Sequence, residues 1–181
     1  MDIAATAIAD VKLITPTVFG DDRGFFLESW HAQKFAAAGI DAAFVQDNHS
    51  RSAKGILRGL HYQSPAAQGK LVRVTRGAVF DVAVDLRRAS PTFGRWVGAE
   101  LSAANHAMLW VPPGFAHGFL TLADDTDFLY KCTAPYAPEH EHCLAWDDPD
   151  IAIAWPDVGM TPLLSTKDHC GRRLADAVPF A

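Results

Sequence analysis

The sequence predicts an all-β domain of the sandwich or barrel type, and three observations lead to this prediction. Ten short segments rich in Val, Leu, Phe and Trp have the character of strands. Turn-forming residues such as Gly20-Asp21-Asp22, Arg76-Gly77 and Pro112-Pro113-Gly114 separate these segments. The first half of the chain offers only one good helix, residues 31–38, so strands and helices do not alternate as βαβ units require.

The expected elements follow from residue type and from the turns that bound them. The helix is rich in alanine and is stopped by Gly39. Val79, Val82 and Val84 stand around Asp81 and Asp85 and predict a strand. The valines do not keep a strict two-residue alternation, so apolar residues fall on both faces of this strand. After about residue 135 the chain is punctuated by prolines, and a turn at 147–150 precedes a strand-like stretch at 151–155. The strands are expected at 11–17, 24–29, 44–49, 57–62, 71–75, 78–86, 96–101, 108–111, 118–121 and 127–133.

Composition narrows the class of protein. A chain of 181 residues with 49% hydrophobic and 20% charged residues is expected to form one globular domain over residues 1–181, with its C-terminal segment packed on the barrel. The net charge of −5 and the lack of Lys/Arg runs argue against nucleic-acid binding. No apolar run is long enough for a membrane span, and the N-terminus lacks the basic start of a signal peptide. Three cysteines without a CxxC motif fit a cytoplasmic protein.

Polar residues crowd two neighbouring segments, QDNHS at 46–50 and GILRGLHYQ at 55–63. They place two histidines, an arginine, an Asp-Asn pair and two glycines among apolar residues. A buried polar group without a hydrogen-bond partner costs about 1–3 kcal/mol, so a strand whose only role is to pack in the core would not contain so many polar residues. These segments predict the wall of a small-molecule site.

Residues 112–117 fit the pattern PxGxxH, which is similar to the second motif of cupins, where the final His usually binds a metal. The first cupin motif contributes HxH and then Glu. Here Gln63 replaces the second His of that motif, and Ala66, Ala67 and Gln68 supply no carboxylate. Two imidazoles alone are a poor divalent-metal site. We therefore expect a cupin-type double-stranded β-helix (jelly roll) without a metal.

A second His-x-His, formed by His140, Glu141 and His142, stands near Cys143. Its ligand order does not match a cupin, and the segment is flanked by prolines. We expect it to be a solvated loop and not a zinc site.

His61 is the natural general base of this region, because a histidine titrates near neutrality. It needs a carboxylate to orient it, and Asp81, Asp85 and Asp168 are all candidates. The alternative interpretation of His61, a hydrogen-bonded core histidine, is about equally favoured by this residue alone. Tyr130 is either a packed aromatic residue or a proton donor.

Arg23 is either a solvated loop charge or a phosphate ligand beside two phenylalanines that could stack on a base. No GxSxG nucleophile elbow and no glycine-rich phosphate loop occurs.

Taken in order along the chain, these blocks resemble the dTDP-4-dehydrorhamnose 3,5-epimerase family of metal-free cupins. The resemblance covers nearly the whole chain. It runs from DRGFF at 22–26 through QDNHS, GILRGLHYQ, KLVRV, GAVFDVAVDLR, SPTFGRW, LSAAN, WVPPGFAHGF, FLYKC and WDDP to LSTKD at 164–168.

The resemblance implies an isomerase that needs no cofactor. Its substrate would be a dTDP-linked 4-keto-6-deoxyglucose, inverted at C3 and C5 through an enolate to give dTDP-4-dehydro-L-rhamnose. It implies that His61 is the base, Asp168 its orienting carboxylate, Tyr130 the opposing acid and Lys70 the cation beside the enolate oxygen. The family is dimeric, with N-terminal strands that cross to the partner. Implied substrate contacts are Arg23, Glu28, Gln46, Asp47, Asn48, Arg58, His117, Glu141 and Lys167, of which Arg58 suits the diphosphate.

Two other functions stay open on the sequence. Related enzymes invert only C3 or only C5, or move the carbonyl of a similar dTDP-4-keto-6-deoxy sugar. From a different class, a non-catalytic sugar-nucleotide-binding cupin would share the fold, because cupins host many activities.

Overall fold

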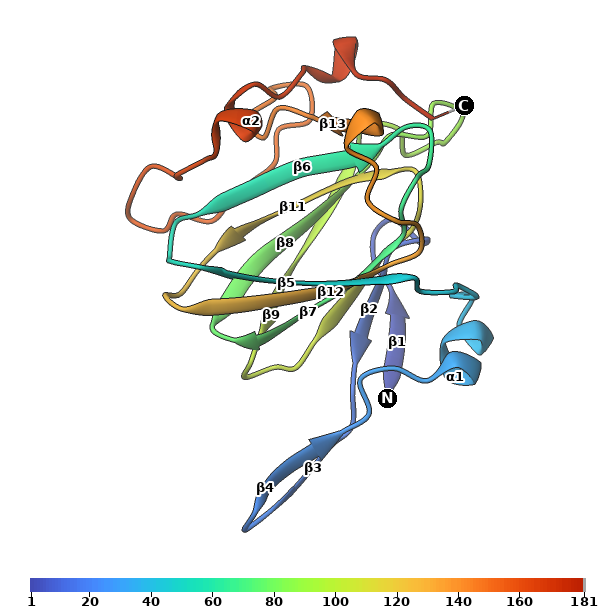
Figure 1. Cartoon of the computed structure of the whole chain (residues 1–181), viewed down its shortest axis with the longest axis vertical. Helices are drawn as coiled ribbons and strands as arrows, with labels where there is room; N and C mark the ends of the chain where they lie inside the picture. Colours follow the sequence, from blue (N-terminus) through green and yellow to red (C-terminus); the bar gives the residue numbers. More distant parts are fainter. Residues whose placement is uncertain (181) are drawn as a thin grey trace.

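Antiparallel strands are the main secondary structure of the computed structural model, which describes residues 1–180 (Figure 1). A six-stranded sheet has the order β1-β2-β10-β7-β12-β5, and a five-stranded sheet the order β13-β6-β11-β8-β9. From β5 to β12 the chain passes back and forth between these sheets, as in a jelly roll. The predicted all-β, cupin-type fold is therefore confirmed.

The elements have the following bounds. The six-stranded sheet contains β1 (Asp2–Ala5), β2 (Lys12–Thr15), β5 (Gln46–Ser52), β7 (Lys70–Arg76), β10 (Met108–Val111) and β12 (Thr126–Cys132). The five-stranded sheet contains β6 (Leu57–Gln63), β8 (Ala78–Asp85), β9 (Trp96–Ser102), β11 (Phe115–Thr121) and β13 (Glu141–Cys143). A separate ribbon and two short helices complete the fold: β3 (Val18–Asp21), β4 (Gly24–Leu27), α1 (Ala32–Ala37) and α2 (Thr166–His169).

The main core lies between the two sheets. Val72 and Phe128 come from the six-stranded sheet, and Ala83 and Phe119 come from the five-stranded sheet. The rings of Phe119 and Phe128 stack with their centroids 4.0 Å apart. Both rings also form part of the wall of a pocket between the sheets.

Two glycines allow the strands that carry His61 and His117 to approach closely. Gly59 has a φ of +127°, and a Cβ there would lie 2.5 Å from Cα of Gly118. A Cβ on Gly118 would lie 2.6 Å from the carbonyl oxygen of Arg58. A side chain at either position would push β6 away from β11, so these glycines set the spacing of the two histidines.

All ten predicted strands and the helix at 31–38 are present within a few residues of their expected bounds. The expectation was wrong at the His-x-His segment: Glu141, His142 and Cys143 form β13, and a 3₁₀ turn at Pro138–His140 precedes it. β13 is an edge strand of three residues, formed by pairing with β6. Such a strand depends on a tertiary partner more than on its own composition.

The strand expected at 151–155 does not form. Ala152 has a φ of +52°, which is incompatible with an extended strand, and Trp155 donates its indole N–H to the carbonyl of Trp146 at 2.9 Å. Ile151 and Trp155 instead pack against the outer side of the five-stranded sheet. On this covered side, Val82 and Val84 of β8 are fully buried.

Asp85 holds together the turn between β8 and β9. Its carboxylate accepts hydrogen bonds from the Arg87 guanidinium at 2.7 and 2.9 Å and from the hydroxyls of Ser90 and Thr92 at 2.6 Å. Burial opposes the charge, but the hydrogen bonds outweigh burial and lower the pKa of Asp85 to about 2.

We expect Asp85→Asn to destabilise the fold by about 2 kcal/mol at pH 7. Because the folded pKa is depressed, this stabilisation is complete above the unfolded pKa near 4 and is lost as the pH falls through about 2. Urea unfolding should show that the free energies of unfolding of the parent and of Asp85→Asn differ by about 1 kcal/mol less at pH 3 than at pH 7. A difference that does not change with pH would mean that the charge of Asp85 is not its source.

Candidate active site

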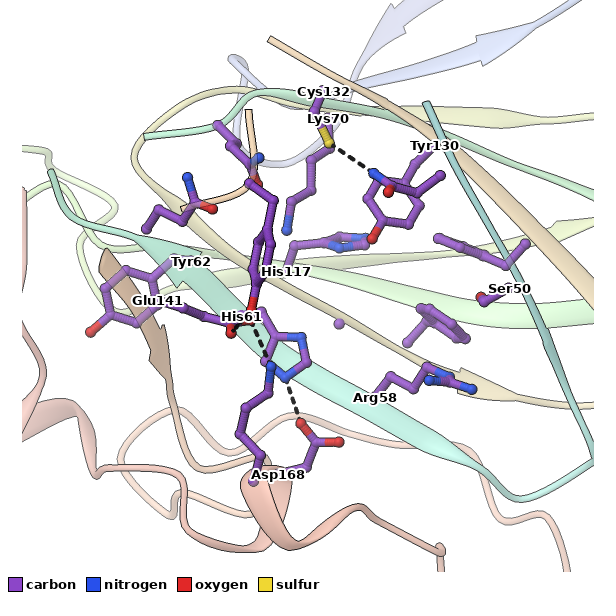
Figure 2. Close-up of a pocket in the computed structure, with 18 of the residues that line it drawn as sticks. Ser50, Arg58, His61, Tyr62, Lys70, His117, Tyr130, Cys132, Glu141 and Asp168 are labelled. Carbon is purple, nitrogen blue, oxygen red and sulfur yellow. Dashed lines mark hydrogen bonds and ion pairs between the residues drawn. The ribbon is translucent and has the colours of Figure 1, made fainter. Parts of the chain in front are cut away.

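A polar pocket of about 420 Å³ opens between the two sheets. This volume suits a small molecule, and Figure 2 shows side chains from both sheets pointing into it. Ten residues predicted from the sequence line the pocket: Gln46, Asn48, Arg58, His61, Lys70, His117, Tyr130, Glu141, Lys167 and Asp168.

His61 and Asp168 form the shortest polar contact in the pocket. His61 Nε2 lies 2.5 Å from Oδ1 of Asp168, and the Ser165 hydroxyl donates to Oδ2 at 2.8 Å. Ser165 also caps α2 by accepting the backbone N–H of Asp168. Of the three carboxylates considered for His61, the structure brings only Asp168 to its ring within residues 1–180.

The electrostatics of this pair suit a base. Burial lowers the pKa of His61, and the nearby Asp168 only partly offsets this effect. Burial also opposes ionisation of Asp168, but hydrogen bonds from His61 and Ser165 outweigh burial and hold the pKa of its carboxyl below the usual value. At neutral pH the pair is therefore a neutral imidazole beside a carboxylate. With Nε2 directed to Asp168, Nδ1 keeps a free lone pair that can accept a proton.

Tyr130 and Lys70 stand across the pocket from His61. They belong to β12 and β7 of the six-stranded sheet, whereas His61 belongs to the five-stranded sheet (Figure 2). Burial raises the pKa of Tyr130, so its phenol is protonated and can donate. Lys70 is buried and forms no salt bridge within the described part of the chain. Burial lowers the pKa of Lys70, and an anion placed beside it would raise that pKa again.

His117 and Asp81 form a second buried pair. His117 Nε2 lies 3.0 Å from both oxygens of Asp81, and neither residue is more than 6% exposed. Burial raises the pKa of Asp81, and His117 opposes this shift. His117 lies directly across from His61 in the β11–β6 ladder, so the two rings share the face that lines the pocket.

At the rim, Glu141 joins two other side chains. Its carboxylate accepts hydrogen bonds from Lys167 Nζ and from the Tyr136 hydroxyl, both at 2.7 Å. Burial opposes its charge, but these contacts prevail and lower the pKa of Glu141. Sequence reasoning missed Tyr136, and we find no local motif that marks it.

Strand periodicity decides which residues of β5 reach the pocket. Gln46, Asn48 and Ser50 alternate along one face and all line it. Asp47 points to the other side, where it pairs with Lys131 at 3.0 Å. Applying the two-residue alternation of a strand to residues 46–50 would have predicted Ser50 as a pocket residue and would have excluded Asp47.

Arg23 and Glu28 also lie outside the pocket of their own chain. Arg23 pairs with Asp21 at the tip of the β3–β4 ribbon, which extends away from the barrel (Figure 1). Glu28 pairs with Lys34 of α1 at 2.7 Å.

The residues at the cupin metal positions do not fit a metal. His61 and His117 direct Nε2 to two different carboxylates, Asp168 and Asp81, and not to one shared point between the two rings. The side-chain N–H of Gln63 donates to the carbonyl of Ala66 at 2.9 Å, and its side-chain oxygen accepts the backbone N–H of Ala137 at 2.9 Å. The amide of Gln63 is committed to the backbone, so the set offers fewer donors than a cupin metal requires.

Comparison with known proteins identifies the family. A family model described as dTDP-4-dehydrorhamnose 3,5-epimerase matches residues 5–176. The dTDP-4-dehydrorhamnose 3,5-epimerase of Pseudomonas aeruginosa is 60% identical over 181 residues, with 99% of each chain covered.

Solved structures agree with the family model. The dTDP-6-deoxy-D-glucose-3,5-epimerase of Legionella pneumophila, in complex with dTDP-4-keto-L-rhamnose, superposes with a TM-score of 0.95 at 50% identity, covering 99% of this chain and 98% of that one. A 3'-monoepimerase of Streptomyces bikiniensis, in complex with dTDP-quinovose, superposes with a TM-score of 0.88 at 38% identity, covering 94% and 87%. With a family model that spans nearly its whole length and a relative of this identity, the chain belongs to the dTDP-4-dehydrorhamnose 3,5-epimerase family.

Proposed function

We propose that this protein epimerises dTDP-4-dehydro-6-deoxy-D-glucose at C3 and C5 to dTDP-4-dehydro-L-rhamnose in dTDP-L-rhamnose biosynthesis. The observation that carries the proposal is His61 of the five-stranded sheet, paired with Asp168 of α2 and facing Tyr130 and Lys70 of the six-stranded sheet. Inversion at a carbon next to a ketone needs a base and an acid on opposite faces of the ring, and this pocket supplies both. The Pseudomonas and Legionella relatives described above are named as 3,5-epimerases of this kind of dTDP-linked sugar.

In the proposed mechanism, Nδ1 of His61 removes the proton at C3 or C5, which the C4 ketone acidifies. The imidazolium that forms is stabilised by Asp168, already held by Ser165. Negative charge moves to the C4 oxygen, where the ammonium group of Lys70 stabilises it. The phenol of Tyr130 then gives its proton to the opposite face of the carbon. The steps require neither a metal nor an organic cofactor.

Binding of the nucleotide is assigned to the remaining polar residues. The Nε–H of Arg58 donates to the Ser52 hydroxyl at 3.1 Å, so its two terminal nitrogens remain available to the diphosphate. Gln46, Asn48, His117, Glu141 and Lys167 are proposed to hold the rest of the substrate.

We also propose that the protein is a homodimer, with the β3–β4 ribbon seated on the partner. Phe19, Phe25 and Phe26 of this ribbon are 63%, 63% and 69% exposed, an unusual apolar surface for an isolated chain. Such an exchange would carry Arg23 and Glu28 towards the partner's pocket, and Asp47 would lie near the covered sheet. Light scattering should give twice the chain mass of 19.6 kDa, and Phe25→Asp combined with Phe26→Asp should give the monomer.

Location in the cytoplasm is the third part of the proposal. Within residues 1–180, no helix is long and apolar enough to cross a membrane. Cys132, Cys143 and Cys170 are all free thiols, which is usual for a reducing compartment. Fractionation of cells that produce the tagged protein would test this location.

Solvent exchange tests the proposed reaction. The protein is incubated with dTDP-4-keto-6-deoxyglucose in heavy water, with and without a chelator, and deuterium is located by NMR. We expect label and inversion at both C3 and C5, unchanged by the chelator. Label at one carbon would instead identify a mono-epimerase, migration of the carbonyl a ketoisomerase, and no label a different substrate or a binding role.

A further inference from the structure

Cys143 lies beside the proposed catalytic pair, although the mechanism does not use it. In the β13–β6 ladder Cys143 stands directly opposite His61, and directly opposed residues of antiparallel strands project from the same face. Its sulfur is 4.0 Å from Oδ1 of Asp168. The donor atoms of His61, Cys143 and Asp168 all lie within 4.8 Å of one another.

Three elements hold this cluster in place. His61 comes from β6, Cys143 from β13 and Asp168 from α2. After α2, the chain is fastened to the end of β13 by two backbone hydrogen bonds: Arg172 donates to the carbonyl of Cys143 at 2.9 Å, and Ala145 donates to the carbonyl of Arg172 at 2.7 Å. The cluster is therefore built by the sheet and by the segment that packs on it, not by a free loop.

Imidazole nitrogen, thiolate sulfur and carboxylate oxygen are the ligands of tetrahedral zinc sites. Bonds of about 2.0–2.3 Å place such ligand atoms roughly 3.3–3.8 Å apart. The present separations are 2.5 Å for nitrogen to oxygen and 4.0 Å for sulfur to oxygen. Separating the His61–Asp168 pair by less than about 1 Å, with a small rotation of the thiol, would produce the required spacing.

Charges of both signs surround the cluster: Lys167 and Lys70 lie near His61, and the carboxylates of Asp168 and Glu141 lie near Cys143. Lys167, the cation nearest to the pair in sequence, is bound to Glu141 at 2.7 Å. The neighbouring histidines do not compete for the ion: His142 packs its ring against Tyr62, and His140 lies beside Glu139.

We propose that a thiophilic divalent cation such as Zn²⁺ or Cd²⁺ binds His61, Cys143 and Asp168, with water as the fourth ligand, and that it inhibits the enzyme. The cation takes the lone pair of His61 Nε2, so the ring proton must reside on Nδ1, and the thiol releases its proton to solvent. His61 then has no free nitrogen to accept a proton from the sugar. The cation is an inhibitor at this site and has no part in epimerisation.

Cadmium titration tests the site, because a cadmium thiolate absorbs in the ultraviolet whether or not the protein turns over substrate. We expect about one equivalent of Cd²⁺ to produce this absorption in the parent protein and to abolish turnover, and EDTA to reverse both effects. Cys143→Ala should keep the parent's turnover and lose the absorption. It should need at least about tenfold more Cd²⁺ for inhibition, because even indirect ligand partners contribute that much to affinity.

Cys170→Ala is the matched control, since this exposed thiol lies outside the cluster, and it should behave as the parent does. His61→Asn should weaken binding while the thiolate absorption persists at higher Cd²⁺. The proposal is wrong if Cys143→Ala keeps the absorption, or if the parent protein turns over normally with the cadmium thiolate formed. A parent that binds Cd²⁺ as expected but epimerises nothing would contradict the proposed reaction and leave the metal site intact.

Discussion

We expect His61→Asn to lower turnover of the dTDP-4-keto sugar by about 10³-fold, the largest effect of any single substitution in the pocket. Asparagine has roughly the length of the imidazole and can still donate an N–H to Asp168, but it cannot accept a proton from carbon. Deuterium incorporation at both C3 and C5 should fall together, because the same base serves both positions. The measurement is the initial rate of exchange and of product formation, followed by NMR.

The affinity of His61→Asn for dTDP shows whether the slower turnover comes from the missing base or from a damaged fold. The affinity for dTDP should stay within about threefold of the parent value, since His61 is assigned to the sugar and not to the nucleotide. His140→Asn is the matched control, because this histidine lies outside the pocket and should leave the rate unchanged. Exchange at the parent rate in His61→Asn would show that another group removes the proton.

In the proposed mechanism, Asp168 acts on the reaction only through His61, which makes it a positioning residue. Its 2.5 Å contact keeps Nε2 protonated and Nδ1 free, and its charge stabilises the imidazolium. Loss of this partner should therefore affect the same step as His61→Asn, and the two losses should not add.

Tyr130→Phe is expected to have the second-largest effect, a fall of about 10²-fold or more in the rate of inversion. Only the phenolic proton is removed, so His61 can still form the enolate. The proton then returns from the face it left, and exchange with solvent continues without inversion. The ratio of deuterium exchange to epimerisation should rise well above the parent value in a single NMR time course.

A tyrosine in the opposite layer provides the control for this substitution. The Tyr62 hydroxyl accepts the backbone N–H of Val178 at 3.1 Å, and its ring packs on Phe180 in the C-terminal segment. Tyr62→Phe should therefore lower stability slightly and leave the ratio of exchange to inversion as it was. If Tyr130→Phe also leaves the ratio unchanged, the acid must be another group.

Sequence patterns were sufficient for much of the barrel, because alternating apolar residues and turn formers act locally. β8 and β12 are recognisable from their own residues. The elements that escaped prediction, such as β13 and α2, are three and four residues long. Their own composition is too weak to specify them, and pairing or packing with β6 supplies the missing free energy.

By itself, the sequence determined the all-β class and the loss of the cupin metal motif at Gln63, and it predicted His61 as the base. The residues alone left three carboxylates open for His61, and the family resemblance pointed to Asp168. The tertiary structure shows why the other two do not reach the ring. Asp81, Asp85 and Asp168 carry the same carboxylate and cannot be told apart by residue type. In the structure, Asp81 is hydrogen-bonded to His117 and Asp85 to Arg87. Asp168 reaches His61 across 107 residues, and Cys143 reaches it through the register of an edge strand. Contacts between distant segments depend on sheet order, register and the path of the C-terminal segment, and no local pattern of residues contains that information.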